Sequence, residues 1–172
     1  AAAVPLGAGT TTIDISLSAL RSVTGTVTSA GSPVAGSKIS VFNATTGAGI
    51  GSTTTNAQGG YTLTNLTATS VKIKASKDGY QTVYQDGKTS LTAAAAVPLG
   101  AGTTTIDISL SALRSVTGTV TSAGSPVAGV KISVFNATTG AGIGSTTTNS
   151  DGVYTLANLT ATSVKIKASK DG

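Results

Sequence analysis

The stretch that decides the fold reads Ser-Val-Lys-Ile-Lys-Ala-Ser-Lys-Asp-Gly-Tyr, residues 70–80. Its apolar residues Val71, Ile73 and Ala75 alternate with lysines, and a period of two is typical of a β-strand with one buried face and one wet face. The Asp-Gly pair at 78–79 is a strong signal for a tight turn between antiparallel strands. These residues therefore predict a strand that ends in a hairpin.

The same alternation recurs on both sides of this stretch. Val23 and Val27 share one face of the first segment, and Gly-rich and Pro-containing turns separate the segments that follow. About seven short strands, with a turn every 8–12 residues, predict an all-β sandwich. The predicted strands are residues 22–29, 38–41, 52–56, 61–63, 70–77 and 80–85, with a loop over 44–51, and a closing strand of the type Thr10–Leu17 that points Ile13, Ile15 and Leu17 inward and Thr12, Asp14 and Ser16 outward.

Composition excludes several classes of function. The chain has no Cys, His, Met, Trp or Glu, only 10% charged residues and 3% aromatic residues. A nucleophile has no base to activate it, a metal or cofactor has no ligand cluster, and disulfides cannot form. The net charge of +5 is spread thinly and lacks aromatic stacking platforms, so we expect no nucleic-acid binding. We predict neither an enzyme nor a cofactor-binding protein.

The chain repeats itself at an offset of 93 residues. Residues 94–172 match residues 1–79 at 74 of 79 positions, and the five differences lie at 37/130, 57/150, 58/151, 60/153 and 64/157. A module that starts with a fresh strand starts at Ser22. We therefore predict three parts: the closing strand of a preceding module (1–21), a complete sandwich (22–114) and a sandwich that lacks its C-terminal strands (115–172).

Residues 22–77 also resemble a known family. Their Val-Thr-Gly-Thr-Val start, the Asn-x-x-Gly-x-Tyr-Thr-Leu turn and strand, and the Val-Lys-Ile-Lys-Ala end are similar to the carboxypeptidase regulatory-like domain, a transthyretin-like (prealbumin-like) seven-stranded sandwich. The resemblance covers nearly the whole 93-residue unit. The resemblance implies the fold and a role as a spacer or surface-protein module. It implies no particular activity, because a fold by itself does not specify one.

Four Asn-x-Ser/Thr sequons fall in predicted loops or at strand ends. They are Asn43, Asn65, Asn136 and Asn158. Asparagines in such positions are accessible to glycosylation in an extracellular protein, although a Thr-rich sequence also produces sequons by chance. We predict these four residues as candidate N-glycosylation sites.

The phase of the repeat predicts a way of joining units. A free closing strand at 1–20 can complete the unfinished sandwich of another copy, inserting Ile13, Ile15 and Leu17 into its core. We expect a head-to-tail homopolymer, as an extracellular or cell-surface filament or stalk. Two alternatives are spacer repeats of a longer surface adhesin and a carbohydrate- or protein-binding module. No apolar run has the roughly 20 residues of a membrane-spanning helix.

Overall fold

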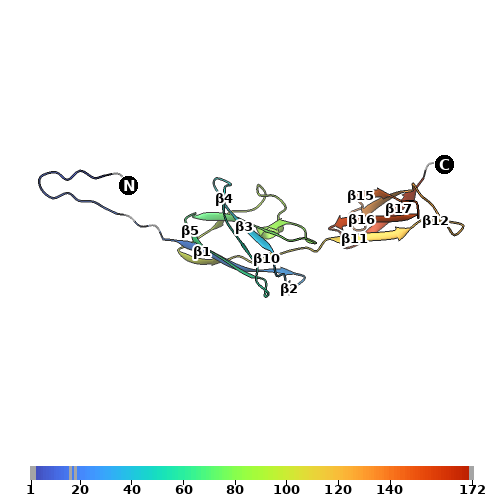
Figure 1. Ribbon diagram of the computed structural model, residues 1–172, viewed down its shortest axis with the longest axis horizontal. Coiled ribbons are helices and arrows are strands. Elements are labelled where there is room, and N and C mark those ends of the chain that lie inside the picture. Colours follow the sequence, from blue (N-terminus) through green and yellow to red (C-terminus); the bar gives the residue numbers. More distant parts are fainter. Residues whose placement is uncertain (1–2, 16, 18, 171–172) are drawn as a thin grey trace.

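The structure is a computed structural model that describes residues 3–15, 17 and 19–170. Two β-sandwiches follow one another end to end, and a tail (the described part of residues 3–20) leads away from the first sandwich on the side opposite the second and then bends back on itself (Figure 1). This arrangement confirms the prediction of an all-β sandwich fold. Among the described residues, no helix has the length and apolar character needed to cross a membrane.

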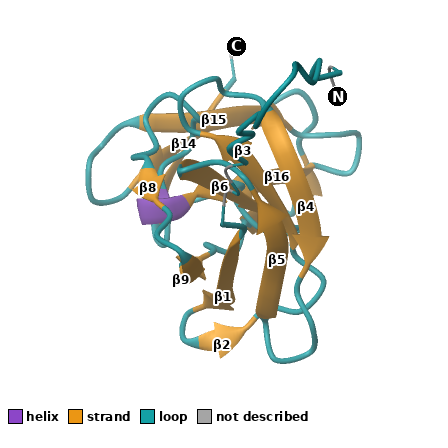
Figure 2. Cartoon of the chain, turned by 90° about the vertical axis from the view of Figure 1, so that its left-hand side faces the viewer, coloured by secondary structure: helices purple, strands orange, loops and turns teal. Residues whose placement is uncertain are grey.

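The first sandwich has two layers (Figure 2). In one layer, β1 lies between β5, which is antiparallel to it, and β9 and β10, which are parallel to it. In the other layer, β3 lies between β4 and β6, and β6 also pairs with β7 and β8. Its elements are β1 (Arg21–Ser29), β2 (Ser32–Pro33), β3 (Lys38–Asn43), β4 (Gly49–Thr54), β5 (Gly60–Leu66), β6 (Ser70–Ser76), β7 (Val83–Tyr84), the 3-10 turn η1 (Gln85–Gly87), β8 (Val97–Pro98), β9 (Gly102–Thr105) and β10 (Ile108–Ser109).

The second sandwich repeats the arrangement of β1–β6 of the first. β11 pairs with β16, and β14 lies between β15 and β17. Its strands are β11 (Arg114–Thr119), β12 (Thr121–Ser122), β13 (Ser125–Pro126), β14 (Lys131–Asn136), β15 (Gly142–Thr147), β16 (Val153–Leu159) and β17 (Val164–Ser169). Within the described part of the chain, no strand lies on the other edge of β11 or of β17.

Three predicted elements differ from the structure. β4 begins inside the predicted loop, because Gly51 pairs with Val41 and has no side chain; a Cβ there would come within 2.7 Å of Leu63 Cδ2. The predicted return strand 80–85 is a strand only at Val83–Tyr84, which pairs with β6, and Tyr80 forms an isolated bridge with Ala112 instead. The described residues of Thr10–Leu17 form no strand where they stand.

Candidate functional site

The closing segment of the first sandwich shows what a filled strand position looks like. β9 and β10 lie beside β1, and the apolar side chains of Ile106, Ile108 and Leu110 are buried at 8%, 4% and 2% exposure. Asp107 and Ser109 between them are exposed. The inward and outward faces predicted for a strand of this sequence are therefore present in this copy. Residues 94–113 are identical in sequence to residues 1–20.

A close approach of two backbones holds this segment against β1. The carbonyl oxygen of Ile106 accepts a hydrogen bond from the Tyr61 hydroxyl at 2.6 Å and lies over Gly25, where a Cβ would come within 1.9 Å of it. Only glycine permits this approach. Burial of the phenol, together with the nearby carboxylate of Asp107, raises the pKa of Tyr61 well above its ordinary value.

The start of the closing segment is anchored separately. The N–H of Leu99 donates to the Thr69 carbonyl at 2.8 Å, and the Leu99 carbonyl accepts from Arg21 Nε at 3.1 Å. The Leu99 side chain is buried in the core cluster. β8, two residues earlier, adds Val97 to the edge of β6 opposite Val71.

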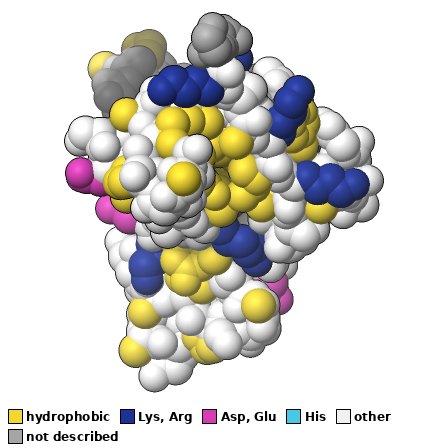
Figure 3. Space-filling view, turned by 90° about the vertical axis from the view of Figure 1, so that its right-hand side faces the viewer, with side chains coloured by type: hydrophobic (Ala, Val, Ile, Leu, Met, Phe, Trp, Pro, Cys, Tyr) yellow, Lys and Arg dark blue, Asp and Glu magenta, His cyan; other side chains and the backbone are white. Residues whose placement is uncertain are grey.

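In the second sandwich the corresponding positions are open. Val23 and Val27 are fully buried, whereas their counterparts Val116 and Val120 are only half-buried. Ile73 has no exposed surface, but its counterpart Ile166 is 42% exposed. Figure 3, which faces the end of the molecule formed by this sandwich, shows apolar side chains gathered between Lys and Arg side chains. The open edge of β11 and the apolar residues beside it form what we call the acceptor groove.

A small cavity marks one end of the acceptor groove. Its volume is about 150 Å³, and the residues that line it include Arg114, Thr162 and Val164. The first two are the counterparts of Arg21 and Thr69, which bond the backbone of Leu99 in the first sandwich. The cavity therefore lies where a leucine at the position of Leu99 would be seated. In the tail that leucine is Leu6.

The tail exposes the side chains that such a groove would bury. Ile13, Ile15 and Leu17, the predicted donor residues, are 53%, 81% and 91% exposed, and Leu6 is 77% exposed. The structure does not bring them together with the acceptor groove of the same chain, because the first sandwich stands between the two (Figure 1). Their contact with an acceptor core stays a prediction.

The open second sandwich also lacks a second element. In the first sandwich, Gln85 of η1 is buried and its Oε1 accepts the N–H of Ile73 at 2.6 Å. Among the described residues nothing takes this place beside Ile166. The tail repeats the sequence of β8–β10 but not that of β7 and η1; in the first sandwich β9 and β10 lie in the layer of β1, and β8 lies at the edge of β6.

The four sequons fall into two structural pairs. Asn43 and Asn136 are half-buried, and the Oδ1 atom of each accepts two main-chain N–H groups of its own turn, at 2.9–3.1 Å. Asn65 and Asn158 are exposed and have left-handed φ angles of 61° and 60°. The second pair is the more accessible of the two. Glycosylation of all four residues stays a prediction.

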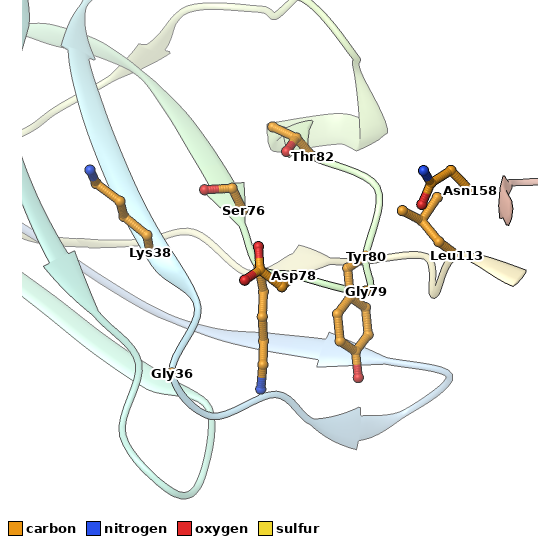
Figure 4. A pocket seen from close by; sticks show the side chains of 10 residues that line it. Gly36, Lys38, Ser76, Asp78, Gly79, Tyr80, Thr82, Leu113 and Asn158 are labelled. Carbon is orange, nitrogen blue, oxygen red and sulfur yellow. The ribbon is translucent and has the colours of Figure 1, made fainter.

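An open pocket of about 670 Å³ lies at the junction of the two sandwiches (Figure 4). Lys38, Asp78, Tyr80 and Leu113 line it from the first sandwich and the linker, and Asn158 lines it from the second. Throughout residues 3–15, 17 and 19–170, no three His, Cys, Asp or Glu side chains gather as metal ligands would.

Sequence reasoning missed the residues that receive the closing strand. Gly25 and Tyr61, with their counterparts Gly118 and Tyr154, stand in the sequence only as parts of the Val-Thr-Gly-Thr-Val and Asn-x-x-Gly-x-Tyr motifs. Asp14 was assigned only to the wet face. A single sequence does not indicate that a glycine contacts a carbonyl oxygen of a distant strand, and Gly25 and Ile106 are about 80 positions apart.

Comparison with known proteins identifies one family and several structural likenesses. The model of the carboxypeptidase regulatory-like domain matches residues 22–111 and 115–172. No curated protein sequence matches the chain. Among solved structures, the Bacillus anthracis TIE protein (14% identity, TM-score 0.45, 89% of this chain and 29% of that one) and the streptococcal ancillary pilin (15%, 0.48, 89% and 59%) are similar. The shaft pilin SpaA from Lactobacillus rhamnosus GG is similar as well (11%, 0.37, 89% and 89%).

The chain therefore spans less than two thirds of the first two of these proteins.

Proposed function

The chain belongs to the carboxypeptidase regulatory-like domain family, and on that premise we propose that it is a non-catalytic structural protein of an extracellular filament or stalk. Its sandwiches join head to tail, and the tail of one copy fills the acceptor groove of the next by β-strand donation. The single observation that supports this most is the identity of the tail with residues 94–113, which fill the equivalent groove of the first sandwich.

The exposed surfaces on the two partners complement each other. Six large apolar side chains of the tail are half or more exposed: Val4, Leu6, Ile13, Ile15, Leu17 and Leu20. Burying each of them contributes about 1.5–3 kcal/mol. The groove offers half-buried valines, the cavity at Arg114 and an unpaired strand edge, which is a template for another chain.

The geometry of the partners favours an open chain of copies. Donor and acceptor are different surfaces at opposite ends of the molecule, so each copy that binds leaves one tail and one groove free (Figure 1). Contacts of this heterologous kind propagate instead of closing into a dimer. A filament is the result that we expect.

A pair of engineered cysteines tests strand donation directly, because the chain has no native Cys. In the first sandwich Ser22 is paired with Thr103 and their hydroxyl oxygens are 2.7 Å apart. The counterparts of these two residues are Ser115 in the groove and Thr10 in the tail. The double variant Ser115→Cys, Thr10→Cys should form a ladder of disulfide-linked oligomers on oxidation.

The matched control moves one cysteine two residues along the strand. Ser115→Cys with Thr12→Cys keeps the cysteine on the same face but places it about 6–7 Å further on, too far for a disulfide, so its ladder should be much weaker. Equal ladders, or none with either pair, would contradict strand donation. A native protein that contains many more 93-residue units in one chain, together with no ladder, would support covalently joined spacer repeats instead.

A further inference from the structure

Two polar contacts fix the closing strand of the first sandwich at one point. Asp107 Oδ1 accepts hydrogen bonds from the main-chain N–H of Thr26 at 2.7 Å and from its hydroxyl at 2.8 Å. The neighbouring carbonyl of Ile106 accepts the Tyr61 hydroxyl. The regular ladder is interrupted between β9 and β10 at this point, so a carboxylate takes the N–H that a main-chain carbonyl would otherwise accept.

The second sandwich carries the same donors with the position open. The counterparts of Gly25, Thr26 and Tyr61 are Gly118, Thr119 and Tyr154. Thr119 is exposed on β11. The Tyr154 hydroxyl lies 2.6 Å from the place of a Cβ on Gly118. In the first sandwich the carbonyl oxygen of Ile106 occupies the corresponding space over Gly25. In the second sandwich the Tyr154 hydroxyl therefore occupies the position that the carbonyl of a donor strand would take.

We propose that Gly118, Thr119 and Tyr154 form a carboxylate site that recognises an Ile-Asp-Ile segment of a second copy of this chain. Asp14 binds the N–H and hydroxyl of Thr119, and the Ile13 carbonyl displaces and then accepts the Tyr154 hydroxyl. The inference rests on the strand donation proposed above and adds the residue that determines how the donor is positioned.

The carboxylate site sets the register of the donor. Apolar residues recur at every second position of the tail around Asp14, so a shift by two residues still turns isoleucine or leucine side chains toward the core. Burial alone discriminates weakly between such registers. A shift by two brings Thr12 opposite Thr119 and leaves the charge of Asp14 without its donors. Charge-assisted hydrogen bonds are about twice as strong as neutral ones, so this mismatch is costly.

The test uses the full chain with its own tail disabled by Ile15→Asp and Leu17→Asp, two exposed side chains outside any strand. The probe is a synthetic peptide of residues 1–20, and binding is measured by calorimetry. We expect the peptide to bind. We expect Asp14→Ala in the peptide to weaken binding about 10- to 100-fold, as loss of hydrogen bonds to a charged group does. Thr12→Ala is the control and should change binding less than about threefold.

Variants of the acceptor complete the test. Thr119→Val in the full chain removes the hydroxyl donor, and its effect should not add to that of Asp14→Ala, because the two groups share one interaction. Gly118→Ala should abolish binding, since its Cβ would meet the donor carbonyl. Gly142→Ala, with ordinary contacts only, is the matched control and should leave binding unchanged.

The possible failures are distinguishable. If the Asp14→Ala peptide binds as well as the unchanged peptide, the carboxylate site is refuted while strand donation stands. If the unchanged peptide does not bind the tail-disabled chain, strand donation itself fails and the carboxylate site fails with it. A peptide with Thr12→Asp and Asp14→Thr that binds as tightly as the original would refute the assignment of register.

Discussion

Shortening one tail side chain, by Ile15→Ala, should weaken association between copies without affecting the folding of a single chain. Ile15 is 81% exposed, whereas its copy Ile108 is 4% exposed and packs in the first core. Truncating a buried isoleucine to alanine costs about 2–5 kcal/mol. If Ile15 enters an acceptor core as Ile108 does, association of copies should weaken by a factor of about 30 or more.

The measurement is the concentration dependence of the sedimentation coefficient, alongside thermal unfolding of the monomer at high dilution. Ile108→Ala is the internal reference, since it should lower the stability of the first sandwich by the amount that Ile15→Ala takes from association. Thr12→Ala, whose copy Thr105 is exposed, should change neither quantity. An Ile15→Ala protein that assembles at the same concentration as the unchanged protein would refute the reasoning.

Three further predictions concern the first sandwich. Gly25→Ala should lower its stability by about 1–3 kcal/mol in urea unfolding, because the new Cβ would meet a backbone carbonyl at 1.9 Å, while Gly49→Ala, which meets nothing within 4 Å, should have little effect. The free energy of unfolding should fall as the pH rises above about 10, because the unfolded chain loses the Tyr61 proton near the ordinary pKa of 10.0 while the folded sandwich retains it. In unfolding measured from pH 8 to 11, Tyr61→Phe should make this fall with pH less steep. Ser37→Val should raise the free energy of unfolding by about 1 kcal/mol, or roughly 4–8 °C in melting temperature. The buried Ser37 hydroxyl makes only a long 3.4 Å hydrogen bond, and the valine at the counterpart position 130 is buried at 4% exposure. A lower melting temperature would contradict this prediction.

The alternation of buried and exposed residues along the strands was the part of the fold that could be predicted best from the sequence. Val71, Ile73 and Ala75 are buried on β6 as their alternation predicted, because a strand with one buried face needs a period of two. The start of β4 was missed because glycines such as Gly51 signal a loop in sequence. In the structure, Gly51 makes room for Leu63 of β5, which lies in the other layer of the sandwich.

The candidate site was predicted only in outline. The phase of the repeat indicated a closing strand with inward Ile and Leu residues, and residues 106–110 show this inward face in the first sandwich, whereas donation by the identical tail stays a prediction. The direction of pairing was not predicted: the closing strand runs parallel to β1, whereas a hairpin pattern suggests antiparallel neighbours. The part played by the carboxylate of Asp107 depends on distances across the fold, which one sequence does not encode in any local pattern.

The parallel pairing of β1 with β9 also determines how a fibre would bear tension. The chain enters the first sandwich through β1 and leaves it after β10, so its entry and exit lie at opposite ends of two neighbouring parallel strands. A pull along the molecule slides these strands past each other and loads their hydrogen bonds together, instead of opening them one at a time. A junction made by a donated tail would have the same shear geometry, so the links between copies would resist stretching in the same way as the sandwiches themselves.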